Sequence, residues 1–216
     1  MYGNEYTQLP IVSITTNDIE IIDDPKIAGS VKILEKDKET YNSFIGIELR
    51  GGVSQQYPKK SYSMELWENE IGDSKEDTSL LGMRVDDDWI LDGMWNEPNR
   101  IRDFTSHELW LAIGRVQNAN TKTKIGISRK YCELFVNGKY KGVYYLSEKI
   151  DRKQLDLVKY NNQIEGELYK GYTWAGGVTY SGLTDYDNNN LTWNGYEAKY
   201  PYPSDEVHIG KTSKCL

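Results

Sequence analysis

Two adjacent lysines, Lys59 and Lys60, follow a Gly-Gly pair and open a run of alternating residues. At the two-residue period of a β-strand, Lys60 points to the same side as Tyr62 and Met64, which is the apolar side. Lysine is almost never fully buried without a partner, so an inward Lys60 needs a carboxylate or an anionic ligand such as phosphate. The pattern therefore predicts an anion-binding cleft at the start of this strand.

A second interpretation of the same strand stays open. If the register slips by one residue, Lys60 faces solvent. If its aliphatic stem runs along the edge of the core and its ammonium reaches water, no ligand is needed either. The alternation alone does not choose between these interpretations.

The elements that must position these lysines are predicted from short β-branched runs separated by Asn, Asp, Gly and Pro, which are typical of an antiparallel sheet. Asn137-Gly138 is the strongest hairpin signal, because both positions of its turn favour positive φ. The predicted strands cover residues 11–14, 19–22, 31–34, 44–49, 60–67, 88–91, 131–136 and 139–146.

One long helix is predicted over residues 98–114, with Pro98 in its first turn and Gly114 at its end. Its expected buried stripe consists of Ile101, Phe104, Thr105, Leu109, Ala112 and Ile113. A short helix capped by Asp151 is expected over residues 152–158. The fold class predicted from these elements is α+β, a mainly antiparallel sheet with one long helix.

Composition narrows the class of partner. The 216 residues carry a formal net charge of -7, and their basic residues are interspersed with acids, which argues against a nucleic-acid surface. No apolar run approaches the roughly 20 residues of a membrane span. The first residues do not have the pattern of a signal sequence, so we expect either a cytosolic protein or one whose signal has been removed. The 17 Tyr, 6 Trp and 19 Gly favour an extracellular, cell-envelope or spore-coat setting, while a cytoplasmic one stays open.

Three stretches resemble the spore coat protein H (CotH) family of atypical protein kinases. They are Arg50-Gly51 with Pro58-Lys-Lys-Ser-Tyr62, then Trp89-Ile-Leu with Asn96-Glu-Pro-Asn-Arg-Ile-Arg102, then Phe135-Val-Asn-Gly-Lys-Tyr-Lys-Gly-Val-Tyr-Tyr-Leu-Ser-Glu148. Their order and spacing match as well. The resemblance implies the N-terminal part of an atypical kinase fold over residues 1–203, followed by an irregular tail over residues 204–216.

The resemblance implies transfer of the ATP γ-phosphate to Ser or Thr of a protein partner, with Mg²⁺ or Mn²⁺. Lys60, Lys59 and Arg50 would then line the ATP cleft. Glu148 is the candidate to pair with Lys60 and fix its position, and the alternative is that Glu148 only caps the segment at Asp151.

The departures from the family concern catalysis. Its aspartates for substrate and metal lie in motifs resembling Asn-x-Asp and Pro-Trp-Asp-Tyr-Asp, and neither motif is present. The local lookalike, Asp185-Tyr-Asp187, reads as a surface turn. Catalytic and metal-binding residues therefore remain unassigned, and the chain is expected to be the first half of a kinase, with weak or no turnover.

Other charged groups are interpreted as structural. Arg102 is expected to bridge to Glu97 or Asp103, and Glu97 stands where the family commonly has Asp. The triplet at residues 86–88 lacks the spacing of a calcium loop, which favours a solvated turn. His107 and His208 lack partners at metal spacing.

A different class of function stays open beside the kinase. Aromatic residues gather in the last third of the chain, where they could stack on sugar rings in an extracellular carbohydrate-binding module. They are Trp174, Tyr180, Tyr186, Trp193, Tyr196, Tyr200 and Tyr202. Simple loop packing would explain them equally well, as in a non-catalytic structural β-rich module.

Overall fold

The computed structural model describes residues 8–36, 38–117, 125–161, 165–171, 192–193 and 195–201. The chain divides into two compact units, Met1–Gly114 with Ile127–Lys149, and Arg115–Gly126 with Ile150–Leu216. Within the described residues, no helix has the length and apolar character needed to cross a membrane.

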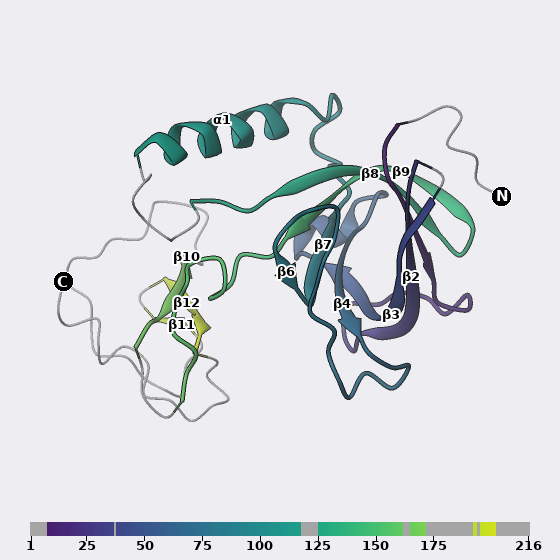
Figure 1. The fold of residues 1–216 in the computed structure, drawn as a ribbon, viewed down its shortest axis with the longest axis horizontal. Helices are drawn as coiled ribbons and strands as arrows, with labels where there is room; N and C mark the ends of the chain where they lie inside the picture. The colour runs from purple at the N-terminus through teal and green to yellow at the C-terminus, as the bar shows by residue number, and fades with distance from the viewer. Residues whose placement is uncertain are drawn as a thin grey trace. The chain divides into compact units, whose positions relative to one another are not determined.

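The first unit is a closed seven-stranded barrel in the order β1-β2-β3-β4-β7-β9-β8 (Figure 1). Every neighbouring pair is antiparallel except β1 and β8, which run parallel and close the barrel. The strands are β1 (Ile11–Thr15), β2 (Ile27–Glu35), β3 (Lys38–Arg50), β4 (Ser61–Trp67), β7 (Asp88–Asp92), β8 (Arg129–Val136) and β9 (Lys139–Glu148). The predicted α+β class is therefore wrong, because this unit is a β-barrel with one helix beside it.

The register predicted for the lysine-bearing strand is correct. Tyr62, Met64 and Leu66 of β4 are buried in the barrel core, with exposed fractions of 6%, 0% and 0%. The core continues through alternate residues of β7 and β9, including Trp89 and Tyr144. This alternation is what a sheet with one buried face requires.

Close backbone packing fixes the far end of β4. The Trp67 ring lies directly over Gly46 of β3, where an added Cβ would come 2.1 Å from the ring, so only glycine fits. The indole Nε1 donates a hydrogen bond to Glu65 at 3.0 Å. A tryptophan on the outer face of the barrel is thereby held flat against the sheet.

The helix differs from its prediction in both bounds and buried face. It is α1 (Arg102–Gln117), and it begins later than expected because Arg100 has φ +53°, which a right-handed helix does not accommodate. Leu111 and Gly114 are buried. Most of the stripe expected to be buried is exposed: Ile101 62%, Leu109 60% and Ile113 48%.

Smaller elements complete the first unit. A 3-10 turn, η1 (Val53–Gln56), follows the Gly-Gly pair, and a short hairpin joins β5 (Thr78–Ser79) to β6 (Val85–Asp86). The hairpin predicted at Asn137-Gly138 is present, with φ values of +48° and +72°. Residues 19–22, predicted as a strand, form an irregular segment in which Ile19 and Ile22 are exposed.

The second unit contains a three-stranded sheet of β10 (Leu168–Gly171), β12 (Tyr196–Tyr200) and β11 (Thr192–Trp193). The helix predicted over residues 152–158 is a turn instead, although Asp151 does accept a hydrogen bond from the Gln154 amide at 3.0 Å. The tail over residues 204–216 lies outside the described residues.

Candidate functional site

The two adjacent lysines point into two different clefts of the barrel unit. Lys60 lines a hollow of about 400 Å³ together with Tyr62 and Val136, and its Nζ donates to the Gln55 carbonyl at 2.5 Å. Lys59 lines a second cleft, of about 340 Å³, together with Arg50. We call this second hollow the Lys59 cleft. The prediction that both lysines share one cleft does not hold, because the two residues directly precede β4 and line different hollows.

The ammonium of Lys59 is held in a half-buried setting. Its Nζ donates to the Val143 carbonyl at 2.5 Å and lies 4.3 Å from the centre of the Tyr144 ring. Burial, and after it the nearby positive charge of Arg100, lower the pKa of Lys59 to about 8, while Asp92 opposes the shift. An anion bound beside Lys59 would therefore stabilise its protonated form.

Three cations at or beside this cleft make no ion pair. Arg50 and Lys59 line the cleft, and Arg100, which is not among its lining residues, is close enough to act on the Lys59 charge. Among the described residues, none places a carboxylate oxygen within 4 Å of any of these three side chains. Lysine and arginine side chains that are left uncompensated around a cavity favour an anionic ligand.

Two of the acids that line the same cleft form ion pairs with arginines outside the set of three cations. Glu97 accepts from Arg102 Nε at 2.9 Å and from the Asn99 amide at 3.1 Å. Asp103 is paired with Arg129. These two carboxylates therefore balance charges other than those of the three cations.

Asp92 differs from the other two acids. Its Oδ1 accepts from the Met94 amide at 2.9 Å, and Ser61 Oγ lies 3.4 Å from the same oxygen. Its Oδ2 has no hydrogen-bond partner among the described residues. One hard oxygen donor is thus left in the cleft, and such a donor suits Mg²⁺ that is shared with a phosphate.

Glu148 binds backbone amides inside the barrel unit and does not lie next to Lys60. Its carboxylate is fully buried and accepts from the backbone amides of Arg84 and Ser128, each at 2.8 Å. It pairs with Trp89 across the sheet, and Trp89 pairs with Met64. Met64 is four residues, or roughly 13 Å of strand, beyond Lys60.

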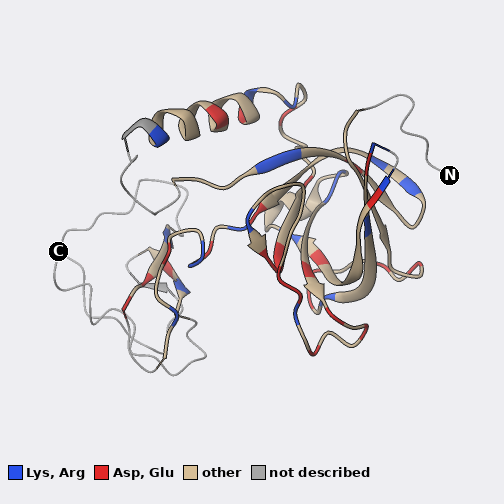
Figure 2. Cartoon of the chain, viewed as in Figure 1, with Lys and Arg blue, Asp and Glu red and all other residues tan. Residues whose placement is uncertain are grey.

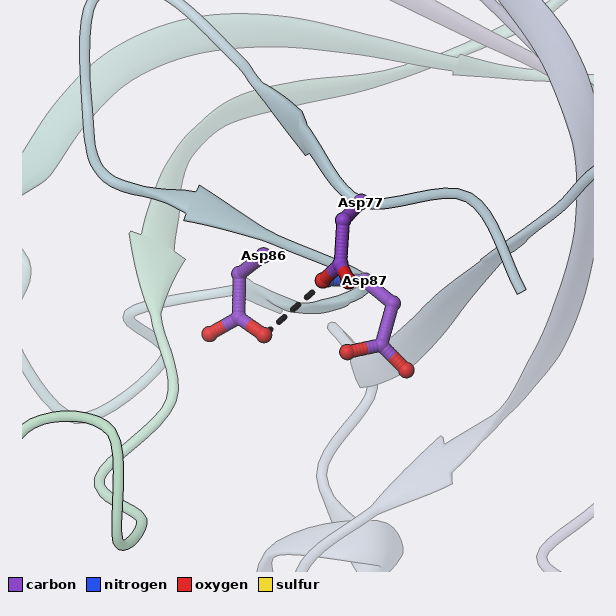
Figure 3. Close-up of side chains that lie close together, drawn as sticks. All are labelled: Asp77, Asp86 and Asp87. Atoms are coloured by element: carbon purple, nitrogen blue, oxygen red, sulfur yellow. Dashed lines mark hydrogen bonds between the residues drawn. The ribbon is translucent and has the colours of Figure 1, made fainter. Parts of the chain in front are cut away.

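Charges of both signs are spread over the barrel strands, as Figure 2 shows. One group of acids stands out: the carboxylate oxygens of Asp77, Asp86 and Asp87 lie within 4.8 Å of one another (Figure 3). Asp86 is fully buried, so the expectation of a solvated turn is wrong here. Arg84 is 2.5 Å from Asp86 and Lys75 is 3.5 Å from Asp87, so the group is balanced by cations.

Sequence patterns missed Arg100 and Asp92. Asp92 could have been found as an outward residue at the end of a predicted strand, one position from the inward Leu91. Arg100 carried no such signal, because it was assigned to a helix that begins only at Arg102. The lookalike Asp185-Tyr-Asp187, the histidine at position 208 and most of the late aromatic residues lie outside the described residues.

Comparison with family models decides the family. A model described as CotH kinase protein matches residues 47–214. The chain belongs to the CotH kinase family. No match was found among the curated proteins. The matched range includes Arg50, Lys59, Asp92 and Arg100, whereas β1 and β2 of this CotH-family barrel precede it.

Proposed function

We propose that this CotH-family chain binds the phosphates of ATP in the Lys59 cleft and serves protein kinase chemistry there. The observation that carries the proposal is that the cations at the cleft make no ion pair. Arg50, Lys59 and Arg100 have no carboxylate partner among the described residues, while Glu97 and Asp103 are paired elsewhere. A triphosphate would supply the missing negative charge.

The residues have distinct tasks in this proposal. Lys59 supplies a compact point charge at a fixed position, since Val143 and Tyr144 hold its ammonium. Arg50 is exposed at the cleft edge and offers a planar fork that suits phosphate oxygens. Mg²⁺ or Mn²⁺ bound with the nucleotide would neutralise phosphate charge, and Asp92 Oδ2 is the oxygen that fits it.

The dimensions of the cleft suit a small ligand. A volume of about 340 Å³ lies in the range of roughly 300–1,000 Å³ that small-molecule sites occupy. Met94 and Trp95 add an apolar wall beside the charged one, which is the mixture that a nucleotide with a base and a phosphate chain requires.

The acceptor is proposed to be Ser or Thr of a protein in the cell envelope or spore coat, as in the resemblance described above. Turnover by these 216 residues is proposed to be weak, because the family's aspartate motifs for substrate and metal are missing from the sequence. Binding and turnover are therefore to be tested separately.

Thermal unfolding with and without ATP and Mn²⁺ tests the binding. Wild type is expected to gain stability with ligand concentration, by about 2.7 kcal/mol when the nucleotide reaches 100 times its Kd. Lys59→Ala should abolish most of that gain. Lys60→Ala is the matched control, because it removes the neighbouring charge from the other hollow, and it should keep the gain.

Two results would contradict the proposal. One is a wild-type chain that binds no adenine nucleotide at any metal concentration tried. The other is a reversal of the variants, in which Lys60→Ala loses the nucleotide and Lys59→Ala keeps it, which would move the site to the Lys60 hollow.

A further inference from the structure

Arg100 is fixed to the barrel through its backbone. Its φ of +53° places it in the left-handed region, which is uncommon for a residue with a side chain. Its carbonyl oxygen accepts a hydrogen bond from the Tyr131 hydroxyl, and the Tyr145 hydroxyl lies 3.1 Å from the same oxygen. Burial raises the pKa of Tyr145, so its hydroxyl stays protonated and can donate at neutral pH.

An aromatic cluster keeps those hydroxyls in place. Tyr131 of β8 and Tyr145 of β9 face each other across the sheet with ring centres 4.7 Å apart. Phe104, in the first turn of α1, lies 4.8 Å from the Tyr131 ring. The unusual backbone of Arg100 is thus held from both sides, by the barrel and by the start of the helix.

The side chain of Arg100 is not engaged in the way that its backbone is. Within the described part of the chain, its Nε is buried without a hydrogen-bond acceptor, and its Nη1 makes a single long contact of 3.4 Å to the Pro98 carbonyl. A buried donor without a partner is costly, and the cost is larger for a charged group. The guanidinium is also close enough to Lys59 for the two charges to repel.

We propose that Arg100 is a third anion-binding residue of the Lys59 cleft, and that with Lys59 and Arg50 it selects ligands that carry a chain of phosphates. The inference rests on the proposed function of this cleft. Three separate cations match several phosphates in a row better than they match a single phosphate group. The Tyr131–Tyr145 pair acts as a positioning device, since it holds the backbone from which the guanidinium extends.

The test uses inorganic tripolyphosphate, pyrophosphate and phosphate in calorimetric titrations at fixed ionic strength, with ATP as a fourth ligand. Wild type should bind tripolyphosphate more tightly than pyrophosphate, and both more tightly than phosphate. Arg100→Gln should weaken tripolyphosphate and ATP by about ten- to a hundredfold, as expected for lost hydrogen bonds to a charged group. Its effect on phosphate should be smaller.

Three further variants separate position from charge. Arg100→Lys keeps the charge but not the fork, and should recover part of the affinity. Arg115→Gln removes an exposed charge from the other end of the same helix and should leave every affinity unchanged. Tyr131→Phe should weaken tripolyphosphate less than Arg100→Gln does, because Tyr145 still contacts the carbonyl.

A measurement on the unliganded protein distinguishes loss of the Arg100 charge from misfolding of the variant. The Lys59 amine titrates among Arg100, Asp92, the Cys132 thiol, the Tyr144 ring and the neighbouring Arg50. Removing the like charge in Arg100→Gln should raise its pKa, as measured by NMR of the lysine side chain or by the pH dependence of amine labelling.

The outcomes are distinguishable. If wild type binds ATP but Arg100→Gln binds it equally well, the assignment of Arg100 is overturned and the proposed function stands. An unchanged Lys59 titration in Arg100→Gln also overturns it. If wild type binds no phosphate ligand, both this inference and the proposed function fall.

Discussion

The two ends of the segment that contains strand β4 differ in whether their charged side chains form ion pairs. At the end near Trp67, Glu65 is buried to 8% exposure and is paired with Lys26 at 3.3 Å and Lys75 at 2.5 Å. At the other end, Lys59 and its neighbouring arginines have no carboxylate partner among the described residues. The first end pairs its own charges and therefore stabilises the fold, whereas the second leaves its cations without ion pairs, which is the basis of the proposed ligand site.

The comparison separates residues that maintain the fold from residues that bind. Substitutions at the paired end should lower the free energy of unfolding and leave anion affinity of the folded protein unchanged. Substitutions in the Lys59 cleft should lower the anion affinity and leave the free energy of unfolding nearly unchanged. If substitutions at both ends changed stability and anion affinity in the same way, unpaired charge would no longer be a basis for assigning the cleft.

The largest effect on stability is expected for Glu148→Ala. The change leaves the partly buried amides of Arg84 and Ser128 without their acceptor, at roughly 1–3 kcal/mol for each. Unfolding in urea should show a loss of about 2–6 kcal/mol. Glu133→Ala is the matched control on the neighbouring strand, because among the described residues the Glu133 carboxylate has a single hydrogen-bond contact, at 3.4 Å from the Tyr140 hydroxyl. Equal losses in both variants would refute the structural role given to Glu148.

A smaller loss is expected for Glu65→Gln, and it should depend on pH. Burial acts to raise the pKa of Glu65, but hydrogen bonds from Lys75 and Trp67 outweigh burial and hold it below its usual value of 4.5. Its contribution is therefore present above pH 4.5 and is lost as pH falls through the lowered pKa. Urea unfolding at pH 7 should show a loss of about 1–3 kcal/mol, and the gap between the two proteins should close in acid. A gap that stays constant with pH contradicts this assignment.

Anion affinity should fall with rising pH at the other end of the strand. Only the protonated Lys59 attracts phosphate, and its pKa of about 8 places the loss within an accessible range. Tripolyphosphate affinity should weaken by up to tenfold per pH unit above pH 8, equivalent to about 1.4 kcal/mol. Calorimetry between pH 7 and pH 10 measures this, and Lys59→Arg should make the affinity nearly independent of pH, because arginine keeps its proton.

The smallest effect is expected on the stability of the unliganded protein when Lys59 is replaced by Met. The lysine is half-buried with a lowered pKa, so its charge does not stabilise the empty fold. Urea unfolding at pH 7 should change by less than about 1 kcal/mol. Because the unfolded lysine holds its proton up to about pH 10.5, wild type should gain stability from pH 8 to pH 10.5, and the variant should not. A large loss at pH 7 would place Lys59 among the residues that maintain the fold.

Local patterns predicted the parts of the fold that local chemistry decides. The alternation around Tyr62 and Met64 gave the correct register, and Asn137-Gly138 gave the hairpin, because period and turn geometry act over a few residues. Closure of the barrel was missed, since it depends on β1 pairing with β8 more than a hundred residues later. No local period encodes that contact.

Prediction from the sequence was limited in a similar way for the helix and for the Lys59 cleft. The apolar residues at positions 101, 109 and 113 favoured one buried face, but the helix turns Leu111 and Gly114 inward instead. Arg100 was missed because its left-handed backbone depends on two tyrosines from distant strands. The lysine pair was found by its residue type, and its division between two hollows was already implied by the strand period.

The parallel pairing of β1 with β8 also has a consequence for how the chain reaches its native state. Val12 lies opposite Leu134, so the first strand emerges from the ribosome long before its neighbour exists. At about 5–20 residues per second, roughly 6–25 seconds separate the two during synthesis. The β1 edge of the nascent sheet stays open until β8 is made, and the barrel closes only when β9, which joins β8 to β7, follows. Exposure to aggregation and to chaperones therefore ends with these two strands.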